Sequence, residues 1–281
     1  MIERYRAVKG YGILVLIVLL VGTFTSCGAD VELAQGRQAA GSSKSIVLVH
    51  GAWMGGWGWD RVAQYLRDQG HTVVAVTLPA HDTDPLPAPA ASLAGYVDVV
   101  AAAVHSVPGP VYLVGHSAGG VVISQFAENE PAAVKQLIYV AAILPQSGQT
   151  LFDLASLDQG SLILPNMTVD MTNYVVSLPV SQVPAILCGD CNPSQAQLLQ
   201  SHYRDEPLLP AATPVSLTAA RFGAVDKRYF FMTQDQTVTY PRQQAMASTV
   251  TLTKTASMNS YHCPQLTRSS EFSDKLLVLM K

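Results

Sequence analysis

One short segment of the sequence has the residue types of a nucleophilic site. Gly115-His116-Ser117-Ala118-Gly119-Gly120 follows an apolar run typical of a buried strand and precedes a stretch typical of a helix. In that context a Gly-x-Ser-x-Gly pattern is typical of a nucleophile elbow, a sharp turn that exposes the serine hydroxyl at the carboxyl end of a sheet. The sequence therefore predicts that Ser117 is a nucleophile. The alternative is a tight glycine-rich turn that happens to contain serine.

A serine hydroxyl needs a neighbouring base to take its proton. His262 follows the last expected strand and comes after Ser117 in the chain, so we predict that it is the base. His81, in the loop after the second expected strand, and His202, in an expected cap, remain alternatives. The other four histidines are expected to be structural, solvent-facing or at the wrong end of the sheet: His50, His71, His105 and His116.

The base in turn needs an acid that fixes its tautomer and stabilises the imidazolium. Asp235 lies just past the apolar run Tyr229-Phe230-Phe231-Met232, at the expected carboxyl end of a strand, whereas Asp226 precedes that run. Three other carboxylates lie in the expected cap: Asp190, Asp205 and Glu206. The chain order serine, aspartate, histidine is the order found in α/β-hydrolases. We therefore predict that Asp235 is the acid; the alternative is an aspartate that only forms a turn.

Backbone donors for a developing oxyanion are expected on two loops. His50-Gly51-Ala52-Trp53 follows the first expected strand, and a backbone N–H there can join the N–H of the residue after the nucleophile. We predict that Ala52 and Ala118 supply these two donors. Trp53 is a candidate for the pocket wall, while packing is expected for the nearby Trp57 and Trp59.

The elements that must position these residues alternate between strand and helix. Strands are expected at residues 46–49, 72–76, 111–114, 137–140, 229–232 and 249–252, and helices at 60–67, 92–107, 117–129 and 269–280. Continuous apolar strands separated by helices indicate a mostly parallel sheet covered on both faces, which is a doubly wound α/β fold. Residues 146–225 break the pattern and are expected to form a cap, with a helix that starts at Asn192-Pro193.

The first residues have the features of an export signal. A basic head is followed by an unbroken apolar run from Ile13 to Val21, too short for a comfortable span of about 20 residues, and then by Ser26-Cys27. The segment resembles a bacterial lipoprotein signal, although Phe24 departs from its usual leucine. We expect a signal peptide at 1–26, lipidation of Cys27, a flexible tether at 27–44 and a hydrolase domain at 45–281. The expected location is the bacterial cell envelope, on the periplasmic or cell-surface side; a plain cleaved signal or an uncleaved anchor are alternatives.

Composition excludes several other classes of protein. With 17 basic and 20 acidic residues the net charge is −3, which argues against a nucleic-acid partner. Four cysteines are too few for a disulfide scaffold, and Cys188-Gly189-Asp190-Cys191 has no second pair that would indicate zinc. Cys188 and Cys191 form either a local disulfide or two free thiols. No metal and no cofactor are expected, and the oligomeric state is left open.

The two loop motifs resemble one enzyme family. Val49-His50-Gly51-Ala52-Trp53 with Gly56-Trp57, together with the serine segment, is similar to the plant methylesterase and hydroxynitrile lyase family. The stretch Thr213–Thr218, leading to Asp235, is similar to the bacterial salicylate-ester and pyrethroid-type esterases. The resemblance covers about 45–281 and implies an α/β-hydrolase fold with a small, mostly helical cap. It also supports the roles assigned to the serine, the acid, the base and the two oxyanion donors.

The resemblance favours ester hydrolysis over cyanohydrin cleavage. The lyases carry lysine after the catalytic histidine and threonine at the position of Gly51, whereas this chain has Cys263 and glycine. A serine carboxylesterase that forms an acyl-enzyme on Ser117 is the main hypothesis. A lactonase or thioesterase with the same triad, or a lipid-anchored or other ligand-binding receptor on this fold, are alternatives. The cap side chains favour small apolar or aromatic esters: Leu151, Phe152, Leu162, Leu164, Met167 and Tyr174.

Overall fold

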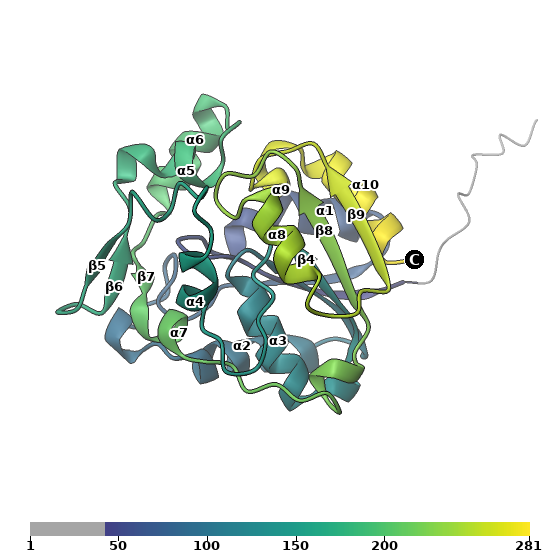
Figure 1. Cartoon of the computed structure of the whole chain (residues 1–281). Coiled ribbons are helices and arrows are strands. Elements are labelled where there is room, and N and C mark those ends of the chain that lie inside the picture. The colour runs from purple at the N-terminus through teal and green to yellow at the C-terminus, as the bar shows by residue number, and fades with distance from the viewer. Residues whose placement is uncertain (1–42) are drawn as a thin grey trace, which may run out of the picture. The chain divides into compact units, whose positions relative to one another are not determined.

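The computed structural model describes residues 43–281. The expected signal peptide, Cys27 and nearly all of the expected tether therefore lie outside the described residues. Six strands form one parallel sheet in the order β2-β1-β3-β4-β8-β9 (Figure 1). Their bounds are β1 Ser45–Val49, β2 Thr72–Val76, β3 Val111–His116, β4 Val134–Val140, β8 Lys227–Met232 and β9 Lys254–Met258.

Helices cover both faces of this sheet. Helices α1 (Asp60–Asp68) and α10 (Ser269–Leu279) pack with Ile46 and Leu48 on one face. Helices α2 (Leu93–His105) and α3 (Gly119–Asn129) pack with the alternate strand residues Val47 and Val49 on the other. Because the inner strands β1, β3 and β4 are buried on both sides, most of their residues are apolar. The expected doubly wound α/β fold is confirmed.

The last strand lies later in the chain than expected. Residues 249–252 form a loop, in which Val250 and Leu252 pack against the core, and the strand is Lys254–Met258. β9 is at the edge of the sheet, and its side chains alternate between partly buried and exposed. An edge strand of this kind lacks a continuous apolar run, whereas the loop before it carries two apolar residues that pack on the core. The prediction of a strand at 249–252 was wrong.

Between β4 and β8 the chain builds the cap, which is gathered on one side of Figure 1. Helices hold more of the cap residues than strands do, as expected. Asn192 caps α6 by accepting a hydrogen bond from the backbone N–H of Gln195. A small antiparallel sheet, β5-β6-β7, was not expected. The cap elements are α4 Leu151–Ser156, β5 Thr168–Asp170, β6 Val175–Ser177, α5 Val183–Leu187, α6 Pro193–Ser201, β7 Glu206–Pro207 and α7 Leu208–Ala212.

Short elements complete the described part of the chain. They are α8 (Tyr240–Ala247), α9 (Pro264–Thr267) and the 3₁₀ turns Gly56–Trp59, Ala88–Ala90, Pro131–Ala133, Val180–Gln182 and Phe222–Ala224. Cys188 and Cys191 form a disulfide in the cap, which answers the question that the sequence left open. Within residues 43–281, none of the helices has the length and apolar character needed to cross a bilayer.

Candidate active site

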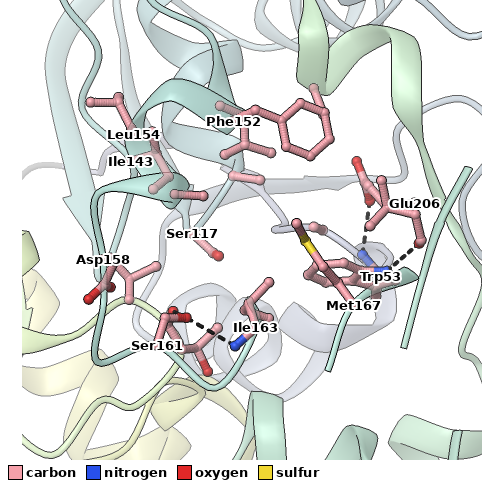
Figure 2. Close-up of a pocket in the computed structure, with 18 of the residues that line it drawn as sticks. Trp53, Ser117, Ile143, Phe152, Leu154, Asp158, Ser161, Ile163, Met167 and Glu206 are labelled. Atoms are coloured by element: carbon pink, nitrogen blue, oxygen red, sulfur yellow. Dashed lines mark hydrogen bonds between the residues drawn. The ribbon is translucent and has the colours of Figure 1, made fainter. Parts of the chain in front are cut away.

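Ser117 lies in the sharp turn between β3 and α3. Its backbone has φ +52°, in the left-handed region that residues with a side chain rarely adopt. Three hydrogen bonds hold this conformation: Ser117 N–H donates to Val140 O at 3.1 Å, and Ser117 O accepts from Gly120 N at 3.1 Å and Ile143 N at 3.0 Å. Strained backbone at a turn persists only when its surroundings fix it in this way. The turn directs the Ser117 hydroxyl into a pocket beneath the cap (Figure 2).

Two glycines allow the first loop to approach this turn. A Cβ on Gly119 would lie 2.6 Å from His50 O, and a Cβ on Gly51 would lie 2.6 Å from the Ser117 Cβ. Real Cβ atoms do not come this close to other heavy atoms. Glycine at both positions therefore brings the backbone just before Ala52 against the serine turn.

His262 and Asp235 form a buried hydrogen-bonded pair. His262 Nδ1 lies 2.7 Å from Asp235 Oδ2. Since a carboxylate only accepts hydrogen bonds, Nδ1 is the donor, and Nε2 is the free acceptor of the neutral ring. These residues follow β9 and β8, neighbouring parallel strands whose carboxyl ends lie at one edge of the sheet. The pair is thus poised to accept a proton at Nε2.

The Asp235 carboxylate is held by three further donors. Its Oδ1 accepts from the backbone N–H groups of Thr237 at 2.7 Å and Val238 at 3.0 Å. Its Oδ2 accepts from Gln243 Nε2 at 3.0 Å, in addition to His262. Both oxygens are therefore satisfied, and the orientation of the carboxylate is fixed. Gln243, in α8, was missed by the sequence reasoning because that helix carries no motif.

His116 connects the serine turn to the histidine loop. Its Nε2 donates to His262 O at 2.9 Å, and the two imidazole rings lie 4.5 Å apart. Burial, with the neighbouring His262, holds the pKa of His116 well below its ordinary value, so the ring is neutral. Within the described residues Ser117 Oγ has no hydrogen-bond partner; such contacts are often long in the absence of substrate.

Ala52, Ala118 and Ser117 line the same pocket. Among residues 43–281, neither the Ala52 N–H nor the Ala118 N–H is used in a hydrogen bond to another protein group. Ala118 also stands at the N-cap of α3, where the helix end favours negative charge. The two expected donors are therefore free, and their residues line one pocket with the serine.

The pocket opens to solvent, and the space between its lining residues, open solvent at the mouth included, is about 650 Å³. Apolar side chains form most of its wall around Ser117 (Figure 2): Trp53, Ile143, Leu151, Phe152, Leu154, Ile163, Met167 and Val176. Three of the cap residues named from the sequence are absent from this lining: Leu162, Leu164 and Tyr174. Tyr174 lies in the exposed turn of the β5–β6 hairpin, because the unexpected sheet turns it away from the core.

Polar groups occupy defined places in the wall. Asp158 accepts from Thr239 N at 2.8 Å and Thr239 Oγ1 at 2.6 Å, and Ser161 Oγ donates to Thr237 O at 2.6 Å. These bonds join the cap to the loop after Asp235. The sequence offered no signal for them because both sides lie in irregular segments. Glu206, which also lines the pocket, was treated only as one of several cap carboxylates.

The alternative bases and acids lie elsewhere. His81 contacts Glu206 at 2.7 Å, and His202 contacts Asp82 at 2.8 Å and stacks on Trp57. Of the remaining carboxylates named from the sequence, Asp226 pairs with Arg228, Asp205 accepts from Tyr203, and Asp190 is in the disulfide loop. In the part of the chain that the structure describes, no cluster of three or more potential metal ligands occurs.

Comparison with known proteins places this geometry in a family. A family model described as "Alpha/beta hydrolase family" matches residues 46–275. "Putative methylesterase 11, chloroplastic" of Arabidopsis thaliana is 27% identical over 212 residues, 72% of this chain and 54% of that protein. "Carbendazim hydrolyzing esterase" of Nocardioides sp. (strain SG-4G) is 35% identical over 118 residues, 39% of this chain and 46% of that protein.

A solved structure shows the same fold. The crystal structure of polyneuridine aldehyde esterase superposes with a TM-score of 0.75 at 22% identity and covers 85% of this chain and 100% of that one. The chain spans only 54% and 61% of the lengths of the first two curated relatives. The expected resemblance to methylesterases and bacterial esterases is confirmed. The resemblance does not assign the activities of those whole proteins to this chain.

Proposed function

Since the chain belongs to the alpha/beta hydrolase family, we propose that it is a serine esterase of small apolar or aromatic carboxylic esters. The observation that carries the proposal is the buried 2.7 Å hydrogen bond between His262 and Asp235. It fixes an imidazole whose free nitrogen accepts a proton, next to the turn that presents Ser117 to an apolar pocket.

In the proposed acylation, Ser117 Oγ attacks the ester carbonyl carbon while His262 Nε2 takes the hydroxyl proton. Asp235 keeps Nδ1 protonated and stabilises the imidazolium. The N–H groups of Ala52 and Ala118 bind the oxyanion of the tetrahedral intermediate, and each preorganised donor contributes about 3–4 kcal/mol. The imidazolium then protonates the leaving alcohol, and the acyl group remains on Ser117.

Deacylation repeats the same steps with water as the nucleophile. His262 Nε2 takes a proton from water, which attacks the acyl carbonyl carbon. The second tetrahedral intermediate uses the same two donors. Its collapse returns the proton to Ser117 Oγ and releases the carboxylic acid, so the enzyme is regenerated without a cofactor.

The pocket wall supports a neutral substrate. Phe152, Leu154, Ile163 and Met167 surround the space in front of Ser117 (Figure 2). Moving apolar groups of a substrate out of water and into this wall is favourable by roughly 25 cal/mol per Å². A charged group against these four side chains would lose its hydration and gain no hydrogen bond from them. Three charged side chains, Arg242, Asp158 and Glu206, also line the pocket.

The residue after the base argues against a lyase. The lyases that the sequence resembles have lysine there, whereas Cys263 is buried and donates its Sγ–H to Leu187 O at 2.9 Å. Burial, with the charges of Asp235 and Asp190, raises the pKa of the Cys263 thiol well above its ordinary value. This position therefore carries a neutral thiol and no cation that could hold cyanide.

The direct experiment is turnover of p-nitrophenyl acetate by soluble protein that begins at Gly28, followed by a panel of methyl esters, aryl esters, lactones and thioesters. The proposal expects the highest kcat/KM for small apolar or aromatic esters. A preference for lactones or thioesters would change the substrate class. Tight binding of esters without turnover would indicate a receptor instead.

We further propose that the protein is exported and anchored through lipid on Cys27. The Ser26-Cys27 segment supports this proposal. The disulfide between Cys188 and Cys191 agrees with it, because disulfides persist in oxidising compartments such as the periplasm.

A further inference from the structure

Glu206 is a buried carboxylate that the reaction described above does not use. It begins β7 in the cap, is 4% exposed, and lines the pocket. Its Oε2 accepts two hydrogen bonds, from the backbone N–H of Trp53 at 3.0 Å and from His81 Nε2 at 2.7 Å. The first of these bonds is visible in Figure 2. Glu206 therefore contacts the residue directly after the proposed oxyanion donor Ala52.

Trp53 requires such a contact. Its φ is +58°, in the left-handed region that is unfavourable for a bulky residue. Outliers of this kind persist where surrounding groups hold them, and they cluster at functional sites. Trp53 is held twice by the cap, because its Nε1 also donates to Val176 O at 2.8 Å. Val176 is the register partner of Glu206 in the cap sheet, so one small sheet holds both ends of Trp53.

The preceding peptide is fixed from the other side. His50 Nδ1 donates to Gly51 O at 2.8 Å, while His50 Nε2 accepts from Leu78 N at 3.0 Å. Burial, with the neighbouring His81, lowers the pKa of His50 to about 3, so this tautomer is neutral. In a trans peptide the N–H points opposite to the C=O. Holding Gly51 O therefore aims the Ala52 N–H, and holding Trp53 N–H fixes the next peptide plane.

His81 keeps Glu206 in place. Its Nδ1 faces Pro79 O at 3.1 Å and its Nε2 faces the Glu206 carboxylate, so both ring nitrogens lie against acceptors. An imidazole with two acceptor partners is an imidazolium. Burial acts to lower the pKa of His81, but the charge and hydrogen bond of Glu206 raise it above its ordinary value. Below this raised pKa the two side chains form a buried ion pair beside the oxyanion loop.

We propose that Glu206, paired with His81, is a positioning residue that preorganises the oxyanion hole from the cap. The inference rests on the proposed serine esterase function. Glu206 holds the strained Trp53 peptide and thereby keeps the Ala52 N–H directed at the reacting oxygen. The cap thereby holds the oxyanion loop in place. The Ala52 N–H can stabilise the transition state only when the cap is packed correctly against this loop.

The test compares Glu206→Ala, Glu206→Gln and the matched control Asp205→Asn, a neighbouring carboxylate that accepts from Tyr203 and does not contact the loop. Glu206→Ala should lower kcat by roughly 10–100-fold, with KM within about threefold, because one oxyanion donor is misplaced rather than deleted. Glu206→Gln should recover most of kcat, because its amide oxygen still accepts from Trp53. Asp205→Asn should match the wild type.

Affinity for a transition-state analogue separates positioning from general damage. A trifluoromethyl ketone forms a tetrahedral oxyanion on serine, whereas the corresponding secondary alcohol does not. Glu206→Ala should lose affinity for the ketone by the same factor as kcat and keep its affinity for the alcohol. Equal losses for both compounds, or an unchanged kcat, would overturn the inference. If Glu206→Ala does not fold, Glu206→Asp supplies the same comparison, because its shorter side chain cannot reach Trp53 N.

Hydrogen exchange tests the contact independently of turnover. The Trp53 amide should be protected in the wild type and in Glu206→Gln, and should exchange faster in Glu206→Ala. Unchanged protection in Glu206→Ala would refute the positioning role, whatever the activity. A different outcome is that Glu206→Ala loses protection of the Trp53 amide while the wild-type protein hydrolyses no ester. That outcome would refute the proposed esterase function but support the contact between Glu206 and Trp53.

Discussion

His116 Nε2 donates a hydrogen bond to the backbone carbonyl of His262 at 2.9 Å. The residue before the proposed nucleophile thus holds the loop that carries the proposed base, across 146 positions of sequence. Gln265 Nε2 lies 3.4 Å from the other ring nitrogen of His116 and completes the contact. These buried contacts fix the position of the serine loop relative to the histidine loop.

Replacing His262 with alanine should remove ester turnover, because no other imidazole in the described part of the chain contacts Asp235. The loss should be comparable with that of Ser117→Ala, and the double variant should lose little more, since the residues act as a unit. Steady-state kinetics of the two single variants and the double variant measure this. His202→Ala, which breaks the partly buried contact with Asp82, is the control and should stay active. A His262→Ala protein with most of its activity would reject the assignment of the base.

Replacing Asp235 with asparagine should lower kcat by about 10⁴ and leave the binding of a substrate analogue nearly intact. The amide can donate to Nδ1 and so favours the tautomer that protonates Nε2, which then cannot accept from Ser117. Kinetics and analogue titration of the same preparation separate these two effects.

Asp226→Asn is the matched control for this substitution. Asp226 is next to the opposite end of β8, where it pairs with Arg228, so the change should be almost silent in kcat. If Asp235→Asn kept a wild-type kcat, the acid would have to be another carboxylate.

Acid should destabilise the fold through two buried histidines. Burial lowers the pKa of His50 to about 3 and that of His116 well below its ordinary value, so the unfolded chain binds more protons as the pH falls below about 6.5. Protonation of His50 in the unfolded chain should reduce the free energy of unfolding by about 2 kcal/mol between pH 7 and pH 5, and His116 should add to this loss. His81 has a raised pKa, so its contribution is complete below about 6.5 and is lost only at higher pH.

Urea unfolding at pH 7 and pH 5 measures this difference. His116→Gln should remove one part of the pH dependence, while the exposed His105→Asn should leave it unchanged. Equal free energies of unfolding at the two pH values would show that the buried rings do not remain neutral.

The sequence predicted the sheet and the serine turn because their signals are local. β1, β3, β4 and β8 are apolar on both faces, and Ser117 stands in a six-residue motif. β9 lacked such a signal, because it is an edge strand with partly exposed side chains. Asp235 could be named only from its place after an expected strand and from chain order, since its other partners, such as Gln243, are defined by tertiary contact.

Glu206 could not have been singled out from the sequence. Its partners His81 and Trp53 are 125 and 153 positions away, and the cap sheet that carries it has strands of two and three residues. Strands this short give no periodic pattern. The cap therefore had to be described from the structure, whereas the strand and turn motifs of the domain beneath it could be read from the chain.

Replacing Cys27 with serine should release the protein from the membrane fraction or block its processing. A single acyl chain binds membranes only weakly, so stable attachment needs the several chains of a processed lipoprotein cysteine. Fractionation and mass spectrometry of the N-terminal peptide measure both effects. Unmodified Cys27 in the native protein, with the membrane fraction unchanged by the substitution, would reject the anchor.

The most direct test of the central claim is the site of acylation. After mixing with p-nitrophenyl acetate, the wild-type protein should release a burst of p-nitrophenolate and gain one acetyl group on the peptide that contains Ser117. Ser117→Ala should show neither, with a kcat lower by on the order of 10⁶ and an almost unchanged Tm. Retained turnover in Ser117→Ala would contradict the account. So would an acetyl group on a residue other than Ser117, if that acetyl group is released by hydrolysis during turnover.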